Sequence, residues 1–328
     1  MPKISVVIPT YNRAQLLSEC LESVAVQSFR DFEIVLIDDG STDNTADIAS
    51  TFHVRYFWQP NRGPVAAFNK GIELSTGEYI SILGSDDSLL EQALYRGMQV
   101  LDKHPEVGFS YGQAYLTDEK GSIFGLERPR YKSSYVRSGV EEIRDILVFG
   151  HHIIGSTVMI RRSCLKDVGV FALAFGSGSE DVDLWVRLAK KYATAYIAEP
   201  LAKFRFHPQK FSHERSLKEW ESSNSAILES IFDDAELGPV FHHLRPIAYF
   251  RLYCNMAGVA YDRGQMRIAR AYLFTALRTH PGALFGSLGF NWVSRLAKTW
   301  LPRRILAQAQ RLKRYVRNLT LRYRPTHA

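Results

Sequence analysis

Cysteine is scarce in this 328-residue chain, and its spacing gives no sign of pairing. Cys20, Cys164 and Cys254 lie far apart, and none of them belongs to a CxxC motif. This excludes a disulfide framework, argues against a structural zinc site and fits a reducing compartment. The start of the chain runs directly into the apolar segment Ile4–Ile8, which is too short for a signal peptide. We therefore expect a protein that is not exported and works in the cytoplasm.

Long hydrophobic runs are absent as well. The longest uncharged stretch of the C-terminal part, 279–294, contains His280, Pro281 and several glycines, so it is a poor membrane span. Hydrophobic residues make up 46% of the chain and charged residues 23%, which excludes a disordered or collagen-like protein. The length predicts one large α/β domain with an appendage.

Acidic residues are missing from the end of the chain. None occurs after Asp262, so the net charge of +7 combines −7 over residues 1–262 with +14 over the last 66 residues. On a helix that follows Arg304, the apolar positions of 305–323 separate from most of the basic ones. This basic tail predicts an anionic membrane surface as a partner. A nucleic acid, or a packed helix with a solvated basic face, is the alternative.

Apolar runs alternate with helical patterns over the first 105 residues. Three short runs, in part β-branched, predict strands that are buried on both faces, as in a parallel sheet. The patterns between them have apolar residues on one helical face, and Asn12 with Gln15 predicts a capping box for the first helix. This order predicts an α/β fold whose mostly parallel sheet is flanked by helices. The expected strands are Ile4–Ile8, Ile34–Ile37 and Tyr79–Leu83, and the expected helices are Leu16–Val24, Asp47–Phe52, Val65–Leu74 and Leu89–Lys103.

The remainder of the chain divides into two parts. Strand and helix patterns mix over residues 106–215, beginning with a hairpin around the turn 118–121. From about Ser216 the pattern is helical, so we expect an α-helical, basic C-terminal extension over residues 216–328. The elements expected in the middle part are the hairpin over Gly108–Phe124, helices over Glu141–Val148 and Asp181–Lys191, and a strand over Thr157–Ile160.

Paired acids follow two of the expected strands. Asp38 and Asp39 come directly after the second strand, and Asp86 and Asp87 follow the third. Ligands of open α/β sheets bind at the carboxyl ends of the strands, where four converging carboxylates would repel one another unless a cation lay between them. We therefore expect a divalent metal ion, Mn²⁺ or Mg²⁺, bound by carboxylate and phosphate oxygens. Each pair alone could merely cap a turn, but two pairs at equivalent strand ends favour a site.

Several common nucleotide and hydrolase motifs are missing. The first strand ends in Pro9-Thr-Tyr-Asn-Arg13 instead of the GxGxxG turn of a dinucleotide site, and neither a Walker A motif nor GxSxG occurs. A dehydrogenase, a P-loop enzyme and an α/β-hydrolase are therefore disfavoured. Tyr11 could stack on a base and Arg62 could face a diphosphate, although packing and a solvated loop charge are the alternatives for these two residues.

Small and acidic residues come together in the middle of the chain. The segment 176–179 is Gly-Ser-Gly-Ser and directly precedes the acids of 180–183, a combination that suits a lid closing over a substrate. Acids are also favoured at a helix start, so capping is an equal alternative for Asp181 and Asp183. Farther on, Arg205 and His207 lie on the same side of an extended segment. The other histidines considered, to which no role is assigned because their spacing fits no ligand set, are His151, His152, His213, His242 and His243.

Taken together, these motifs resemble the inverting family 2 glycosyltransferases of bacteria, which have the GT-A fold. The resemblance runs in order over roughly residues 4–210. Unlike the processive synthases, this chain has neither a Gln-x-x-Arg-Trp element after Asp181 nor transmembrane helices, so the resemblance implies a single sugar addition. The matching pieces are Ser5–Arg13, Ile37–Asp43, Asn69–Gly71, Gly77–Ile80, Ser85–Asp87, Glu180–Trp185 and Arg205–His207.

The resemblance also implies roles for individual residues. Asp181 takes the position of the catalytic base, and Asp87 and His207 the positions of metal contacts. Residues 1–105 would form the nucleotide-sugar-binding half of one GT-A domain, and residues 106–215 its acceptor-binding, catalytic half. The implied acceptor and lid residues are Gly178, Glu180 and Trp185, and the implied donor-binding residues are Pro9, Thr10, Tyr11, Arg13, Asp38, Asp39, Arg62, Asn69, Lys70, Asp86 and Arg205.

The implied reaction is metal-assisted direct displacement at the anomeric carbon of a nucleotide-diphospho-sugar, with a bias toward UDP. The acceptor would be a lipid-linked or surface glycan, such as a lipopolysaccharide precursor, at the inner face of the cytoplasmic membrane. A nucleotide-sugar pyrophosphorylase stays open as an alternative, although the Gly-rich basic N-terminal loop of that class is absent. A non-enzymatic nucleic-acid-binding or membrane-binding protein would leave the strand-end acids without a purpose, and we expect no nucleic acid partner.

Overall fold

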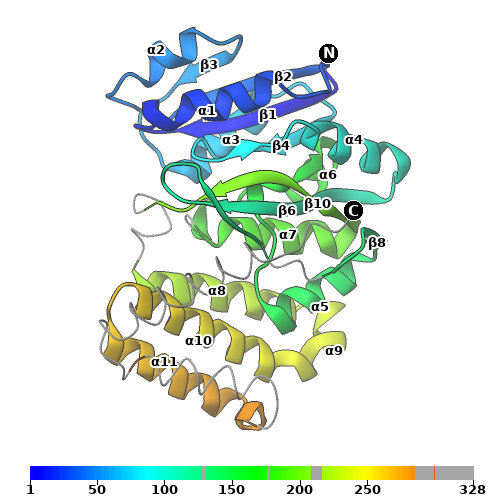
Figure 1. Cartoon of the computed structure of the whole chain (residues 1–328). Coiled ribbons are helices and arrows are strands. Elements are labelled where there is room, and N and C mark those ends of the chain that lie inside the picture. The colour runs from blue at the N-terminus through cyan, green and yellow to red at the C-terminus, as the bar shows by residue number, and fades with distance from the viewer. Residues whose placement is uncertain (128–130, 176–177, 208–215, 285–298, 300–328) are drawn as a thin grey trace, which may run out of the picture. The chain divides into compact units, whose positions relative to one another are not determined.

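The computed structural model describes residues 1–127, 131–175, 178–207, 216–284 and 299 (Figure 1). The chain forms two compact units, of which the first is Met1–His242 and the second begins at His243. The first unit includes helices α8 (Leu217–Phe232) and α9 (Leu237–Phe241), which the sequence analysis assigns to the C-terminal extension. The predicted basic tail helix, His213 and the first two residues of the Gly-Ser stretch lie outside the described residues.

One ten-stranded sheet forms the centre of the first unit. Its strand order is β3-β2-β1-β4-β9-β6-β10-β5, with β7 paired to β6 and β8 to β10. β1 to β4 are parallel, β6 and β10 are parallel, and β9 runs antiparallel between β4 and β6. The predicted α/β fold with a central sheet is confirmed, and the sheet is mixed, because β5, β7, β8 and β9 pair antiparallel to their neighbours. The strands are β1 (Ile4–Thr10), β2 (Phe32–Asp38), β3 (Arg55–Trp58), β4 (Tyr79–Ile82), β5 (Ser88–Leu89), β6 (Val107–Thr117), β7 (Ile123–Leu126), β8 (Tyr135–Arg137), β9 (Met159–Arg161) and β10 (Ala193–Arg205).

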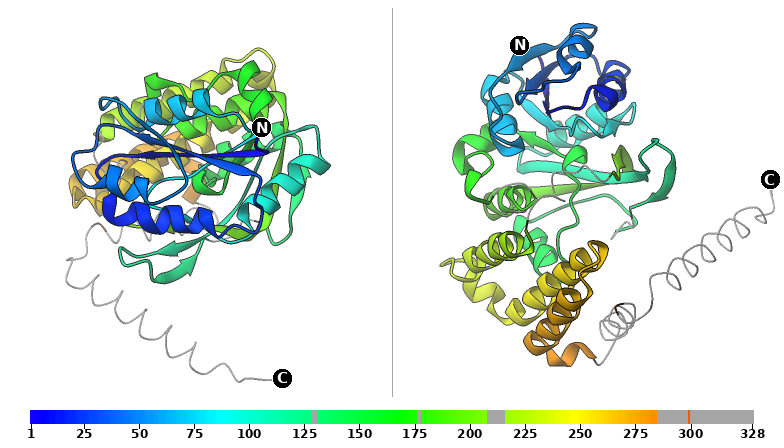
Figure 2. Two further views of the ribbon diagram at one scale, coloured as in Figure 1. Left: turned by 90° about the horizontal axis from the view of Figure 1, so that it is seen from above. Right: turned by 90° about the vertical axis from the view of Figure 1, so that its left-hand side faces the viewer.

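Helices cover both faces of this sheet (Figures 1 and 2). Successive side chains of a strand point to opposite faces, and Ile4, Val6 and Ile8 of β1 join the buried cluster that includes residues of α1 and α4. On the other face, α3 lies so close that a Cβ on Gly71 would be 2.3 Å from Cγ1 of Val7. Burial on two sides explains why β1 is a continuous apolar run. These helices are α1 (Ala14–Ala25), α2 (Thr45–Ser50), α3 (Pro64–Leu74), α4 (Ala93–Lys103), α5 (Gly139–Phe149), α6 (Arg162–Val168) and α7 (Glu180–Lys191).

The turn between β1 and α1 differs from the prediction. Asn12 has a φ of +50°, and its side chain accepts a hydrogen bond from the N–H of Thr42 at 2.8 Å. The carboxylate of Asp43 in turn accepts from the N–H of Ala14 at 3.1 Å. The capping box of Asn12 with Gln15 is therefore wrong. Both bonds tie the end of β1 to the loop after β2, which brings the carboxyl ends of the two strands together.

β3, β5 and β8 were not predicted from the sequence, and only the end of β10 was recognised. Leu89 pairs with Ala202 of β10, so α4 begins at Ala93 and not at the predicted residue 89. β10 pairs with β6 along its length, but its register shifts on either side of Pro200, and such irregularities break the pattern that identifies a strand. The predicted β6–β7 hairpin, β9 and helices α5 and α7 are confirmed within a few residues.

The second unit contains a helical hairpin of α10 (Arg245–Asp262) and α11 (Met266–Thr279). Gly264, with a φ of +76°, makes the turn between them, as the C-terminal end of a helix often requires. The predicted helical character of the C-terminal region is thus confirmed. In the part of the chain that the structure describes, no helix is both long and apolar enough to cross a membrane. The helices pack through Phe250, Cys254, Ala257, Leu273 and Ala276.

Candidate functional site

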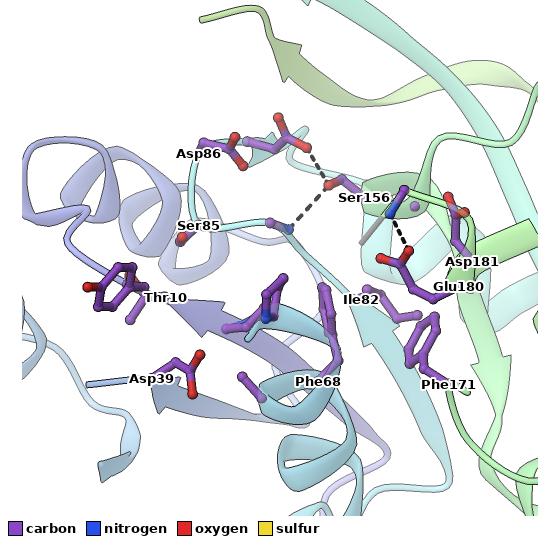
Figure 3. Close-up of a pocket in the computed structure, with 18 of the residues that line it drawn as sticks. Thr10, Asp39, Phe68, Ile82, Ser85, Asp86, Ser156, Phe171, Glu180 and Asp181 are labelled. Carbon is purple, nitrogen blue, oxygen red and sulfur yellow. Dashed lines mark hydrogen bonds between the residues drawn. The ribbon is translucent and has the colours of Figure 1, made fainter. Parts of the chain in front are cut away.

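A pocket lies at the carboxyl ends of β1, β2 and β4 in the first unit (Figure 3). Ligands of open α/β sheets bind at this edge. The end of β1 and the loop after β2 form one side of the pocket, and the start of α7 forms the opposite side. The loop between β4 and β5 lies between these sides, and α3 contributes an aromatic residue. The lining residues are Pro9, Thr10, Tyr11, Arg13, Asp39, Pro64, Ala67, Phe68, Ile82, Gly84, Ser85, Asp86, Asp87, Gly155, Ser156, Phe171, Gly178, Glu180, Asp181, Trp185 and Phe204.

Asp39 is held in this pocket by hydrogen bonds to its carboxylate. Its Oδ1 accepts from the side-chain amide of Gln59 at 2.7 Å and from the N–H of Arg62 at 2.9 Å, and its Oδ2 accepts from the N–H of Gly63 at 2.8 Å. Gly63 has a φ of +86°, a conformation that favours glycine. The turn before α3 therefore fixes the carboxylate, and the side chain of Arg62 is exposed.

The neighbouring Asp38 has a different environment. Its Oδ1 accepts a hydrogen bond from the N–H of Ser41 at 2.7 Å, and its Oδ2 accepts from the hydroxyl of Tyr56 at 2.6 Å. Asp38 is the last residue of β2, so its side chain points away from that of Asp39. The expected convergence of four carboxylates is therefore wrong at Asp38, which supports the loop, whereas Asp39, Asp86 and Asp87 line the pocket.

Asp86 and Asp87 are both anchored to the end of β10. Oδ2 of Asp86 lies 2.7 Å from Nε2 of His207, and Oδ1 of Asp87 accepts from the N–H of Arg205 at 3.0 Å. The guanidinium of Arg205 donates to the carbonyl of Asp86 at 3.1 Å. Oδ2 of Asp87 also accepts from the hydroxyl of Ser156 at 2.5 Å. Arg205 and His207 thus lie behind the acids and are absent from the residues that line the pocket.

The donor set of this region fits a hard divalent cation that shares its ligands with a substrate. In the described part of the chain, no group of three or more His, Cys, Asp and Glu side chains is arranged to hold a metal ion. Asp86 and Asp87 nevertheless offer adjacent carboxylates beside His207. Mg²⁺ and Mn²⁺ are commonly bound by one or two carboxylates together with phosphate oxygens of the substrate. The residues therefore fit such an ion without forming a complete protein cage.

Glu180 and Asp181 lie across the pocket from Asp39 (Figure 3). Oε2 of Glu180 accepts from the N–H groups of Gly178 and Ser179, the latter at 2.9 Å. Oδ1 of Asp181 accepts from the N–H of the next residue at 2.8 Å, and its Oδ2 lies 3.2 Å from Nε2 of His151. Both acids belong to the first turn of α7, where the helix dipole favours negative charge.

The two acids differ in their acidity. Burial raises the pKa of Glu180 to about 7, and the negative charge of Asp181 adds to this effect. Burial acts in the same direction on Asp181, but the charge and hydrogen bond of His151 outweigh it, so the pKa of Asp181 lies below its ordinary value. A carboxylate with a lowered pKa is ionised at neutral pH. Of the two acids, Asp181 is therefore the one that is ionised at neutral pH and ready to accept a proton.

Aromatic side chains form an apolar wall between the donor acids and α7. Phe68 of α3 contacts Phe171 with ring centroids 5.5 Å apart, and Phe171 meets Trp185 edge-on at 6.3 Å. The side-chain amide of Asn69 holds the backbone of Phe171 through two hydrogen bonds of 2.8 and 3.0 Å. Trp185 is fully buried and stacks on Phe109. Trp185 is thus a buried part of the wall that lines the pocket.

Two buried polar atoms of the pocket have no hydrogen-bond partner among the described residues. They are Oγ1 of Thr10 and Nε1 of Trp185. A buried polar atom that lacks a partner is costly, and a ligand in the pocket could satisfy it. Thr10 lies at the end of β1 beside Asp39 (Figure 3), which fits its expected contact with a donor.

The structure brings most of the predicted site residues together, and it separates some of them. Arg62 lies near the pocket only through its backbone, and Lys70 is paired with Glu73 at 3.0 Å. Asn69 supports the wall. The predicted residues outside the lining are Asp38, Arg62, Asn69, Lys70, Arg205 and His207, and those that line it are Pro9, Thr10, Tyr11, Arg13, Asp39, Asp86, Asp87, Gly178, Glu180, Asp181 and Trp185.

Four residues of the site were missed from the sequence. His151 was considered and assigned no role, yet the structure places it in contact with Asp181. Ser156 binds Asp87 from a short 3₁₀-helix, and Phe68 and Phe171 form the wall. None of these four residues belongs to a local motif. One signal for these residues was present in the sequence: Phe68 directly precedes Asn69, a predicted site residue, in the same expected helix.

Comparison with known proteins gives the family of the chain. Residues 5–169, about half of the chain, match the family described as Glycosyl transferase family 2. An uncharacterized glycosyltransferase of Rickettsia felis is 31% identical over 207 residues, which are 62% of this chain and 33% of that protein. A PGL/p-HBAD biosynthesis glycosyltransferase of Mycobacterium bovis is 32% identical over 184 residues, 53% of this chain and 65% of that protein. The chain thus spans only a third of the length of the Rickettsia relative.

Solved structures show the same fold. TarS of S. aureus in complex with UDP-GlcNAc has a TM-score of 0.62 at 18% sequence identity, over 91% of this chain and 89% of that one. The mannosyltransferase PcManGT of Pyrobaculum calidifontis in complex with GDP-Man and Mn²⁺ has a TM-score of 0.56 at 18% identity, over 91% and 85%. Identities this low show the fold alone, and neither alternative class from the sequence analysis is favoured. The chain therefore belongs to glycosyl transferase family 2 and is a glycosyltransferase with the GT-A fold.

Proposed function

We propose that this enzyme transfers a single sugar from a nucleotide-diphospho-sugar, with a UDP-sugar as the first choice, and inverts the anomeric configuration. The observation that carries the proposal is the arrangement of acids in one pocket. Asp39 lies on one side, Asp181 lies on the opposite side, and Asp86 lies between them (Figure 3), while the adjacent Asp87 also lines the pocket. This spacing suits a donor whose nucleoside contacts Asp39 and whose sugar points toward Asp181.

Donor binding would depend on the loop between β4 and β5. Asp87, with Asp86 and His207 beside it, would hold Mn²⁺ or Mg²⁺, which neutralises the charge that develops on a departing diphosphate. Thr10, Tyr11 and Asp39 would contact the base and ribose. The proposal of a divalent ion is supported by the two carboxylates and by the Mn²⁺ reported for the mannosyltransferase PcManGT.

Proton removal from the acceptor would fall to Asp181. As the acceptor oxygen forms its bond to the anomeric carbon, the bond from that carbon to the diphosphate oxygen breaks, and its electron pair leaves with the nucleoside diphosphate. The hydroxyl proton goes to the Asp181 carboxylate. A direct displacement of this kind inverts the anomeric centre, and the lowered pKa of Asp181 supports the assignment.

The acceptor would be a lipid-linked or surface glycan, and the basic end of the chain would hold the enzyme at an anionic membrane. The support for this localisation is the sequence, which carries a charge of +14 over its last 66 residues. Each basic residue near an anionic leaflet contributes about 1 kcal/mol. We expect the protein to co-sediment with phosphatidylserine vesicles at low salt, and not with phosphatidylcholine vesicles. Substituting Arg311, Lys313, Arg314 and Arg317 by Gln should release it.

A panel of nucleotide sugars tests the proposed donor. UDP-, GDP-, dTDP- and CDP-sugars are compared for Mn²⁺-dependent thermal stabilisation of the protein, since a ligand that binds only the folded state raises its stability. We expect UDP-sugars to give the largest shift and EDTA to abolish it. Stabilisation by free nucleoside triphosphates, with none by any nucleotide sugar, would contradict the proposal and favour a nucleotidyltransferase.

A further inference from the structure

A histidine lies directly beside the proposed base. Nε2 of His151 is 3.2 Å from Oδ2 of Asp181, and the two side chains keep 38% and 27% of their exposure. His151 follows α5, whereas Asp181 belongs to the first turn of α7. α5 and α7 pack against each other, so the contact between the two side chains depends on the packing of this helix pair.

Both oxygens of the Asp181 carboxylate have a neighbour that orients them. The N–H of Val182 donates to Oδ1 at 2.8 Å, and His151 faces Oδ2. A general base acts efficiently only when its lone pair is held at a fixed place relative to the reacting hydroxyl. Without His151, the hydrogen bond from the N–H of Val182 would still orient Oδ1 of Asp181, but Oδ2 would lose its contact with the imidazole.

Negative charge surrounds the His151 imidazole. Burial lowers the pKa of His151, but the charge and hydrogen bond of Asp181 and the charges of Glu127 and Glu180 outweigh burial, so the pKa lies above its ordinary value. Glu127 is itself partly buried, which raises its pKa to about 7 against the opposing charge of His151. The three acids therefore favour the protonated, positively charged form of the imidazole.

The adjacent Glu180, whose carboxylate accepts from the N–H groups of Gly178 and Ser179, has a pKa shifted in the direction opposite to that of the proposed base. Burial and the charge of Asp181 raise its pKa to about 7. Asp181 experiences burial too, yet His151 keeps its pKa below the ordinary value. Of these neighbours on one helix turn, the acid that faces His151 is the one whose pKa is lowered.

We propose that His151 orients the Asp181 carboxylate and keeps it in the charged form that accepts the proton of the incoming hydroxyl. The inference rests on the proposed function, in which Asp181 is the base. His151 is a positioning residue, because it acts on the reaction through Asp181. The imidazole neither gains nor loses a proton in the transfer step itself, and the hydroxyl proton ends on Asp181.

Titration by NMR tests the pair without any substrate. In the full-length protein, the ring C–H signals of His151, assigned with His151→Gln, should titrate at a lower pH in Asp181→Asn than in the wild type, because the opposing charge is gone. In His151→Gln, the carboxyl carbon of Asp181 should titrate higher than in the wild type. Equal midpoints in wild type and variants for both groups would overturn the proposal.

Kinetics then separate this inference from the proposed function. With UDP-N-acetylglucosamine as donor and water as acceptor, His151→Gln should lower kcat by ~10-fold, leave KM for the donor unchanged and move the acid limb of the kcat profile to higher pH. His104→Gln removes another histidine beside a carboxylate, the half-buried His104 at 3.1 Å from Glu106, and should behave as wild type. An inactive Asp181→Asn together with a wild-type pH profile for His151→Gln would sink the positioning role alone. Wild-type turnover in Asp181→Asn would sink the proposed base.

Discussion

Nε2 of His207 lies 2.7 Å from Oδ2 of Asp86, although the two residues are 121 positions apart in the chain. This contact joins the loop after β4 to the segment that follows β10. The backbone N–H of Arg205 makes a second link between the same two segments, to Asp87 at 3.0 Å. The acids proposed to bind the metal ion are therefore positioned by the end of β10 and the residues that follow it, and not by their own loop alone.

This pairing predicts that His207 supports metal-dependent donor binding. We expect His207→Gln to weaken the affinity for UDP in the presence of Mn²⁺ by ~10-fold, as is typical when a partner of a ligating carboxylate is removed. Asp86→Asn should weaken it further. Isothermal titration of UDP with Mn²⁺, and again with EDTA, measures the effect. If both variants bind UDP like the wild type in Mn²⁺, Asp86 and His207 do not contribute to the metal site.

Asp181→Asn is expected to separate chemistry from binding. Asn is nearly isosteric with Asp but cannot accept the acceptor proton, so transfer should fall by ~10²-fold or more while donor affinity is kept. The matched control is Asp183→Asn in the same helix turn, since Asp183 pairs with Arg187 at 2.7 Å. Single-turnover transfer and UDP titration measure the two quantities. Loss of donor affinity with unchanged turnover in Asp181→Asn would assign this residue to donor binding.

The sequence was sufficient for the strands that are buried on both faces. β1 is a continuous apolar run because Val7 packs against α3 and its neighbours pack on the other face. The acids that follow β2 and β4 were predictable for the same reason, since the ends of parallel strands meet at one edge. β3 was not predictable, because its residues are half-exposed or exposed and lie at the edge of the sheet.

Side-chain direction and long-range contacts were the parts that the sequence could not supply. Asp38 and Asp39 are adjacent, yet one supports the loop through Tyr56 and the other lines the pocket. For two adjacent acids, the sequence does not reveal which side chain faces a ligand, because this depends on the exact residue at which the strand ends. His151 reaches Asp181 only because α5 packs on α7, and no spacing along the chain predicts that contact.

A buried charge cluster behind the site makes stability depend on acid pH. Glu142 is fully buried and accepts hydrogen bonds from Arg137 at 2.9 Å, Thr194 at 3.0 Å and Tyr111 at 3.0 Å. Burial by itself raises its pKa, but His152 and Arg137 outweigh burial and lower it from 4.5 to about 2. A folded-state pKa below the unfolded value stabilises the protein above pH 4.5, and this stabilisation is lost as the pH falls toward 2.

Glu142→Gln should therefore reduce the free energy of unfolding by roughly 3 kcal/mol at pH 7, because Arg137 loses the charge of its buried partner. The difference between wild type and variant should shrink as the pH falls from 5 to 2. Urea unfolding at several pH values measures it, with the exposed Glu91→Gln as a control that stays within about 0.5 kcal/mol of wild type. If the difference in the free energy of unfolding stayed constant from pH 5 to pH 2, the charge of Glu142 would not be its cause.

The packing of α5 on α7 is expected to control both stability and activity. A Cβ on Gly139, at the start of α5, would lie 1.7 Å from the carbonyl oxygen of Ala189 and 2.4 Å from that of Tyr192. Backbone cannot yield as a flexible side chain can, so Gly139→Ala must push α5 away from α7 and lower the free energy of unfolding by about 1–3 kcal/mol. In Gly125→Ala, whose added Cβ would meet one side-chain atom at 3.9 Å, both stability and activity should be near wild type.

The displacement of α5 in Gly139→Ala should also affect catalysis. Because α5 leads to His151 and α7 begins with Asp181, it should lower kcat. The affinity for UDP depends on the opposite side of the pocket and should be kept. Urea unfolding measures the stability of the two variants, donor hydrolysis measures kcat, and UDP titration measures donor affinity. If Gly139→Ala is destabilised but keeps the wild-type kcat, the contact between the two helices does not set the geometry of the base.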